Sequence, residues 1–67
     1  MELRKVAQVA CSTNGCPTIF VSGDEVVIQG YSVDRAQTGL EVPDGETLVR
    51  IPRSLLHDGS TLLRTQD

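Results

Sequence analysis

The chain has 67 residues, of which 39% are hydrophobic, and a formal net charge of −3 at pH 7. This length allows one small domain, residues 1–67, with a limited core. The acidic balance argues against a nucleic-acid partner, because phosphate binding needs a basic surface. The N-terminal residues lack the apolar segment of a signal peptide, and no run approaches the roughly 20 apolar residues of a membrane span. We therefore expect a cytoplasmic protein without membrane contact.

The N-terminal segment, residues 3–11, fits two periodicities. Its apolar residues recur at a helical spacing from Leu3 to Ala10, and they also alternate from Ala7 to Cys11. Because no N-cap residue precedes the segment and a hairpin follows it, we predict a strand. The turn after it is predicted by Asn14-Gly15, since both residues tolerate positive φ.

A β-hairpin is predicted over the next part of the chain. Two runs rich in β-branched and aromatic residues, 18–22 and about 25–31, flank a polar centre in which Gly23 can take positive φ. Pro17 has no N–H, so it fits the start of the first strand.

Side-chain alternation in this hairpin is imperfect. Ile19 and Val21 are expected to share one face, and Val26 and Ile28 another. Gly30 predicts a bulge or a close backbone approach within the second strand.

Glycines and capping residues predict turns in the middle of the chain. A short helical turn is predicted after Ser32, with Ser32 or Asp34 as its cap and Gly39 at its end. A tight turn is predicted over residues 43–46, where Pro presets φ at the second position and Gly45 supplies positive φ.

A strand and a helix are predicted near the C-terminus. The strand covers residues 47–51, and Pro52 then opens a helix at the favoured first position. This helix is expected to cover residues 53–58 and to end at Gly59, which leaves residues 60–67 as a flexible tail.

Together these elements predict a mostly β fold of the α+β type. It is a four-stranded antiparallel sheet with one or two short helices, the C-terminal helix packing on one face. So small a core and open sheet edges favour a homodimer. The expected core residues are Val9, Ile19, Val21, Val26, Ile28, Val33, Leu40, Leu48, Ile51, Leu55 and Leu56.

Cys11, Cys16 and His57 are the residues that could bind a metal. Zinc usually takes four ligands, and these three residues leave the set one short, so we expect no cofactor, with zinc as the alternative. A hairpin-bridging disulfide between Cys11 and Cys16 is a further alternative, which a reducing cytosol disfavours. We therefore expect two free thiols. His57 beside Asp58 does not by itself make a catalytic site, and no phosphate-binding loop is present, so we expect no enzyme.

A protein-contact surface is the remaining candidate site. The chain has one Phe and one Tyr, too few for a stacking platform, so Phe20 and Tyr31 are expected to be core or interface anchors. We predict that Phe20, Gln29 and Tyr31 in the hairpin, or Leu62 and Leu63 at the C-terminus, form the interaction surface.

Three motifs carry a family resemblance that covers about residues 11–57. They are C-P-T-I-F at 16–20, Q-G-Y at 29–31 and P-D-G-E-T-L-V-R-I-P-R-S-L-L at 43–56. In these motifs the chain resembles small, uncharacterised actinobacterial (Streptomyces-type) proteins that are often encoded beside helix-turn-helix regulators. The resemblance implies a non-enzymatic role through contact with a regulatory protein.

A second, shorter resemblance supports an alternative. Residues 45–56 resemble the start of swapped-hairpin transcription factors of the AbrB and MazE type, in which a strand ending in Ile-Pro leads into a helix. The leading prediction is a homodimeric interaction module that contacts a regulatory protein. The alternative is a small regulator that binds zinc through Cys11 and Cys16, or DNA through Arg50 and Arg53.

Overall fold

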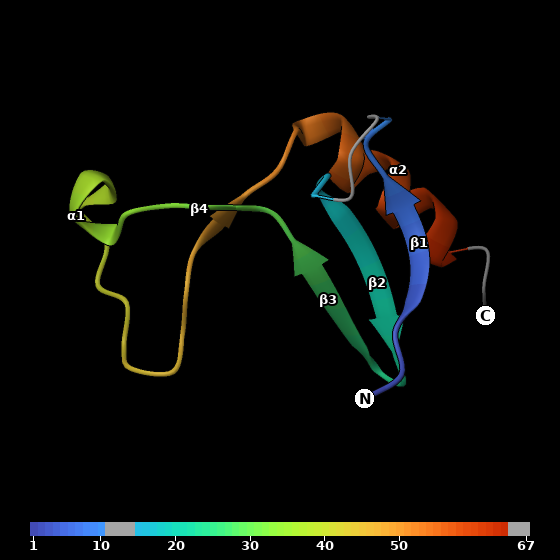
Figure 1. Ribbon diagram of the computed structural model, residues 1–67, viewed down its shortest axis with the longest axis horizontal. Helices are drawn as coiled ribbons and strands as arrows, with labels where there is room; N and C mark the ends of the chain where they lie inside the picture. Colours follow the sequence, from blue (N-terminus) through green and yellow to red (C-terminus); the bar gives the residue numbers. More distant parts are fainter. Residues whose placement is uncertain (11–14, 65–67) are drawn as a thin grey trace.

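The computed structural model describes residues 1–10 and 15–64, which contain two antiparallel sheets and two helices. The first sheet has the strand order β1-β2-β3, and the second pairs β4 with β5 (Figure 1). The α+β class is therefore confirmed, whereas the single four-stranded sheet is wrong. The elements are β1 (Arg4–Gln8), β2 (Thr18–Ser22), β3 (Glu25–Gln29), β4 (Tyr31–Ser32), α1 (Arg35–Thr38), β5 (Val49–Arg50) and α2 (Arg53–Arg64).

Gly30 is the point at which one sheet becomes two. The strand predicted over residues 25–31 is interrupted there, because the chain leaves β2 and β4 pairs with β5 instead. A Cβ atom on Gly30 would lie 2.7 Å from the carbonyl oxygen of Arg50 and 2.8 Å from Cγ2 of Ile51. The predicted close backbone approach is confirmed, and the strand predicted at 47–51 is confined to Val49–Arg50.

The hairpin of β2 and β3 closes with a tight turn in which Gly23 has a φ of 58°. Directly opposed residues of an antiparallel pair lie on the same face of the sheet. Ile19 and Val21 of β2 therefore share one face with Val26 and Ile28 of β3. The prediction that the two strands present these residues on different faces is wrong. The register is Ser22↔Glu25, Val21↔Val26, Phe20↔Val27, Ile19↔Ile28 and Thr18↔Gln29.

β1 completes the sheet as an edge strand. The strand predicted for the N-terminal segment is confirmed over Arg4–Gln8, and its register against β2 shifts between Lys5 and Ala7. The bulge of this fold thus lies in β1. Asn14 of the predicted turn lies outside the described residues.

α2 packs on β1 and β2 and covers the aliphatic face of the sheet there. It begins after Pro52, as predicted, and the N–H of Leu55 donates to the Pro52 carbonyl at 3.0 Å. The helix does not end at Gly59, which lies against Ile19 in the interior of the contact. It continues to Arg64, so residues 60–64 belong to the helix and not to a tail.

The predicted turns between β4 and β5 are confirmed. The side chain of Asp34 caps α1 by accepting from the N–H of Ala36 at 3.0 Å, and Gly39 closes it with a φ of 72°. The N–H of Glu46 donates to the Pro43 carbonyl, with Gly45 at a φ of 90°. Pro43 thus occupies the first position of this turn and not the second.

The buried core is smaller than the sequence predicts. Among the described residues the buried apolar side chains are Cys16, Pro17, Ile19 and Leu55, while Val9, Val21, Val33, Leu48 and Ile51 are half-buried. Four predicted core residues are exposed: two lie in β3, one in the loop after α1 and one in α2. These residues are Val26, Ile28, Leu40 and Leu56.

Substituting Gly59→Ala should lower the free energy of unfolding, although alanine is normally favoured over glycine in a helix by about 1 kcal/mol. The new Cβ would lie 2.5 Å from Cδ1 of Ile19, so the helix or the sheet must shift. We expect a loss of about 1–3 kcal/mol in urea unfolding. Ile19→Val removes that Cδ1, so the double variant should lose less than the sum of the two single losses. Ser60→Ala, at an exposed position in the same helix, is the control and should not destabilise.

Candidate interaction surface

Residues 30–52, here called the arm, project from the body formed by β1, β2, β3 and α2 (Figure 1). Within the arm β4 packs on β5, whereas α2 packs on the strands of the body. α1, in the arm, has no buried residue. A two-stranded ribbon alone is marginally stable in water, so such an arm gains from a partner that covers it.

Local hydrogen bonds order the arm despite its small core. The N–H of Val33 donates to the Leu48 carbonyl at 3.2 Å and extends the β4–β5 ladder. Nη1 of Arg35 donates to the Val42 carbonyl at 3.0 Å, which ties α1 to the segment that follows it. The N–H of Leu40 donates to Oγ1 of Thr38 at 3.1 Å.

Leu40 is the most exposed large hydrophobic side chain of this ordered arm. Its side chain is 61% exposed, and its backbone is held by the bond to Thr38. The same stretch, with Arg35 and Val42, borders a shallow hollow. Because its backbone is already ordered, Leu40 adds little backbone ordering cost on binding, which suits it to anchor a protein contact.

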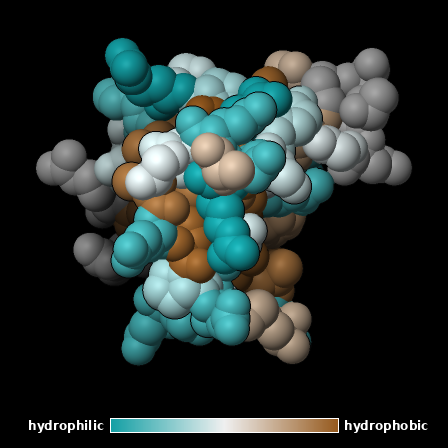
Figure 2. All heavy atoms as spheres, turned by 90° about the vertical axis from the view of Figure 1, so that its left-hand side faces the viewer, coloured by the Kyte–Doolittle hydropathy of each residue, from teal (hydrophilic) through white to brown (hydrophobic). Residues whose placement is uncertain are grey.

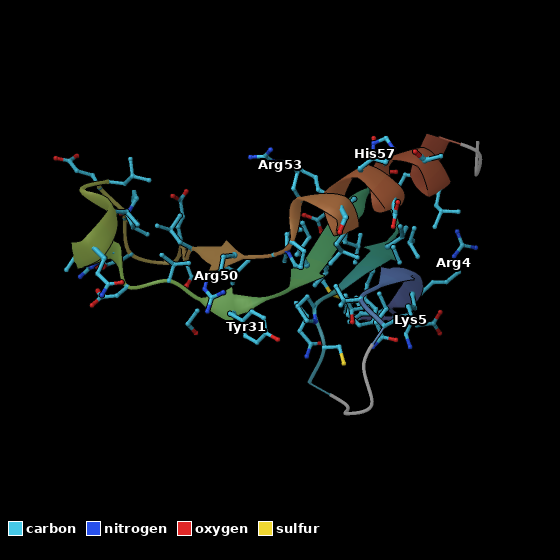
Figure 3. The ribbon with its side chains drawn as sticks, turned by 90° about the horizontal axis from the view of Figure 1, so that it is seen from above. Arg4, Lys5, Tyr31, Arg50, Arg53 and His57 are labelled. Atoms are coloured by element: carbon cyan, nitrogen blue, oxygen red, sulfur yellow. The ribbon has the colours of Figure 1, made fainter. Side chains whose placement is uncertain are left out.

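Tyr31 and Arg50 form the base of the arm. They are opposed in the β4–β5 ladder, and the guanidinium carbon of Arg50 lies 4.9 Å from the centroid of the Tyr31 ring (Figure 3). The ring remains 49% exposed. This cation–π contact orients the ring, and its free surface is available to a partner.

The part of the sheet formed by β3 is the second apolar area. Val26 is 47% exposed and Ile28 is 37% exposed, on the face that α2 covers over β1 and β2. Figure 2 views the molecule from the side of the arm and shows apolar side chains between hydrophilic ones on the face turned to the viewer. Both residues were predicted to be core, and the helix leaves them open.

The whole chain exposes more surface than a folded monomer of its mass. A 7.2 kDa monomer exposes roughly 4,100 Å², whereas this chain exposes 5500 Å². Its radius of gyration is 13.1 Å, against about 10.9 Å for a domain of this length.

The residues predicted for the interaction surface fall into two separate groups. Phe20 and Gln29 lie on the sheet face opposite α2, and Tyr31 follows at the base of the arm. Leu62 and Leu63 lie in α2, where Leu62 borders a groove beside β1.

Sequence reasoning missed Leu40 and Val26 as surface residues. Both looked like core because they are apolar. Leu40 could have been found from its position between Gly39 and Glu41, outside any periodic segment. For Val26 no such indication exists, because its exposure depends on how far α2 reaches.

Cys16 is buried and disulfide-bonded, so the expected free thiol is wrong for this residue. Cys11, the other cysteine of the chain, lies outside the described residues. A sulfur in a disulfide has no thiolate to give to a metal. Among the described residues, no group of three or more His, Cys, Asp or Glu side chains could hold a metal ion. Cys16 is therefore not available as a ligand in the zinc alternative.

His57 borders the groove between β1 and α2, together with Gln8, Asp58 and Thr61. The hydroxyl of Thr61 is already engaged, because it donates to the His57 carbonyl at 3.1 Å. Adjacent residues of a helix point in different directions, so His57 and Asp58 are not placed to act as a catalytic pair.

Arg50 and Arg53, the pair suggested for DNA, do not converge. Figure 3 shows Arg50 over Tyr31 and Arg53 on the other side of the ribbon, at the start of α2. The arm has four acidic residues against two basic ones, a net charge of −2. Its field therefore repels phosphates. No helix within the described part of the chain has the length and apolar character needed to cross a membrane.

Substituting Arg50→Met should change the fluorescence of Tyr31, which is a specific reporter because the chain has one Tyr and no Trp. The variant keeps a long side chain but removes the cation above the ring. We expect altered tyrosine emission and a loss of about 0.5–1 kcal/mol in stability. Arg53→Met is the matched control and should leave the emission unchanged. Unchanged emission in Arg50→Met would show that the contact is not maintained in solution.

Comparison with known proteins does not connect this arrangement to a characterised one. No protein-family model, no curated protein and no solved structure matches the chain. Its function therefore has to be inferred from its own residues and their geometry.

Proposed function

We propose that this protein is a non-enzymatic interaction module that forms a homodimer and uses its arm to contact a helix-turn-helix regulator. The observation that carries this proposal is the arm itself. It is ordered by its own hydrogen bonds, it does not fold back on the body, and it exposes Leu40 and Tyr31. An extension of this kind has a clear use in binding a partner and none in shielding a core.

The homodimer is supported by the surface that one chain leaves exposed. The difference from a monomer of this mass is roughly 1,400 Å², and a standard stable interface buries about 800 Å² on each partner. One such interface between two copies therefore accommodates much of the difference. The exposed Val26 and Ile28 provide the apolar centre that such an interface needs.

The charge of the arm supports a basic partner. Its exposed acidic residues outnumber the basic ones, and Glu41 directly follows the apolar anchor Leu40. Helix-turn-helix proteins bind DNA through basic surfaces, which complement an acidic arm in charge. The acidic residues of the arm are Asp34, Glu41, Asp44 and Glu46. The resemblance to proteins encoded beside helix-turn-helix regulators points to the same class of partner.

A regulator of this class works in the cytoplasm, so the proposal places this protein there. Cytosolic thiols are generally kept reduced, whereas Cys16 is disulfide-bonded. The side chain of Cys16 is 2% exposed. Thiol–disulfide exchange requires access to a sulfur, so burial of Cys16 hinders attack on its own sulfur.

The homodimer is tested by sedimentation equilibrium of the untagged, oxidised protein over a concentration series. We expect a mass of twice 7.2 kDa at the upper concentrations. The mass should fall toward that of one chain on dilution. A single-chain mass throughout the series would exclude the homodimer.

The arm contact is tested by calorimetric titration of the helix-turn-helix regulator encoded nearest to this protein. Leu40→Ser should weaken binding by about tenfold or more, since a buried interface leucine contributes at least about 1.4 kcal/mol. Leu56→Ser is the matched control, because Leu56 is a comparably exposed leucine of the body. Its variant should bind like the unaltered protein.

The contribution of charge can be measured in the same titration. Glu41→Lys should weaken binding and reduce its salt dependence, whereas Asp24→Lys, in the β2–β3 turn, should do neither. Equal effects of the arm and body variants would contradict the assignment of the arm.

A further inference from the structure

We propose that two copies of this chain join through the free edges of β3, antiparallel, around a two-fold axis beside Val27. The product is one continuous sheet with three strands from each copy. This inference rests on the proposed homodimer and assigns its interface. It follows from a difference between the two edges of the sheet, from the direction of the free peptide groups and from the register that the strand allows.

The two edges of the sheet differ in how they are protected. β1 exposes Arg4 and Lys5 and carries the register shift between Lys5 and Ala7. Charged side chains and bulges are the usual devices that prevent an edge strand from pairing. β3 pairs with β2 without a shift over all five residues, and its three central residues, 26–28, are aliphatic. β3 is therefore the edge open to another strand.

The backbone of β3 offers its free groups at two defined residues. The two-residue turn at Gly23 and Asp24 closes with the pair Ser22↔Glu25, and such a closing pair is hydrogen-bonded. Because hydrogen-bonded and non-hydrogen-bonded pairs alternate along the ladder, the peptide groups of Val26 and Ile28 face away from β2. These are the groups that a second β3 strand can satisfy.

One register uses all five residues of the strand. If Val27 of one copy lies opposite Val27 of the other, then Val26 lies opposite Ile28, and Glu25 lies opposite Gln29. If one strand slides by two residues, for example so that Val26 lies opposite Val26, fewer residues of β3 are paired. A slide by one residue would put side chains on the wrong face. This register also avoids placing the two Glu25 carboxylates against each other.

The same register covers the apolar area that α2 leaves open. Val26 and Ile28 lie on the helix-covered face, with exposed fractions of 47% and 37%. In the dimer each Val26 packs beside an Ile28 of the other copy, and the two pairs are related by the axis. The pairing therefore buries aliphatic surface as well as satisfying backbone groups.

Each arm projects on the side of the free edge of β3, where the second copy docks (Figure 1). Each arm starts at Gly30, directly after the C-terminal end of β3. Because the two β3 strands are antiparallel, the arms leave the interface at opposite ends.

The register is tested by cysteine cross-linking on non-reducing gels. Val27→Cys places two cysteines at a non-hydrogen-bonded pair, with a Cα separation of about 4.5 Å, within the range of a disulfide. Lys5→Cys is the matched control. Lys5 and Val27 lie in one row across the sheet, both opposed to Phe20, but at opposite edges. We expect a covalent dimer for Val27→Cys after mild oxidation and none for Lys5→Cys.

Sedimentation of the same variants separates this inference from the homodimer itself. A dimeric mass for Val27→Cys without a cross-link, or a cross-link for Lys5→Cys, would overturn the β3 register and leave the homodimer standing. A single-chain mass for the unaltered protein would overturn both. Val26→Lys, at an exposed position, should give a single-chain mass with an unchanged circular dichroism spectrum. A folded but dimeric Val26→Lys variant would contradict the β3 interface.

Discussion

The contact between Ile19 and Gly59 is the constraint on which the body depends. It joins the central strand to the last helix, and the absence of a side chain at Gly59 lets the helix approach the sheet. The helix packs on β1 and β2, and Val26 and Ile28 of β3 stay partly exposed. The apolar area on β3 is therefore a direct result of where the helix packs, and the proposed self-association starts from the strand that the helix does not reach.

Gly30 has the corresponding role for the arm. Its missing side chain allows Arg50 and Ile51 to pass close to the backbone, so that the chain can return beside itself. The arm has its own short ladder and its own turns, and it needs little from the body. Two glycines thus divide the chain into a part with a core and a part whose apolar residues are presented to the outside.

Much of this architecture was predictable from local chemistry. The hairpin of β2 and β3, the cap at Asp34 and the helix start after Pro52 all depend on neighbouring residues, and all are confirmed. The end of α2 was predicted wrongly because a glycine in a helix has two meanings. Locally it indicates a stop, and only the position of Ile19 shows that Gly59 is a packing site. The exposed interaction surface was the least predictable part, because the sequence alone does not show whether an apolar residue such as Leu40 lies in a core or on a binding surface.

The shift in β1 between Lys5 and Ala7 has a consequence for stoichiometry. A sheet with two adhesive edges can add copies without limit and grow into a fibre, since each addition exposes a new edge. A sheet with one adhesive edge and one blocked edge has used its capacity after a single association. The bulge in β1 thus limits the proposed assembly to a closed pair of chains, because it prevents the outer edges of the dimer from adding further copies.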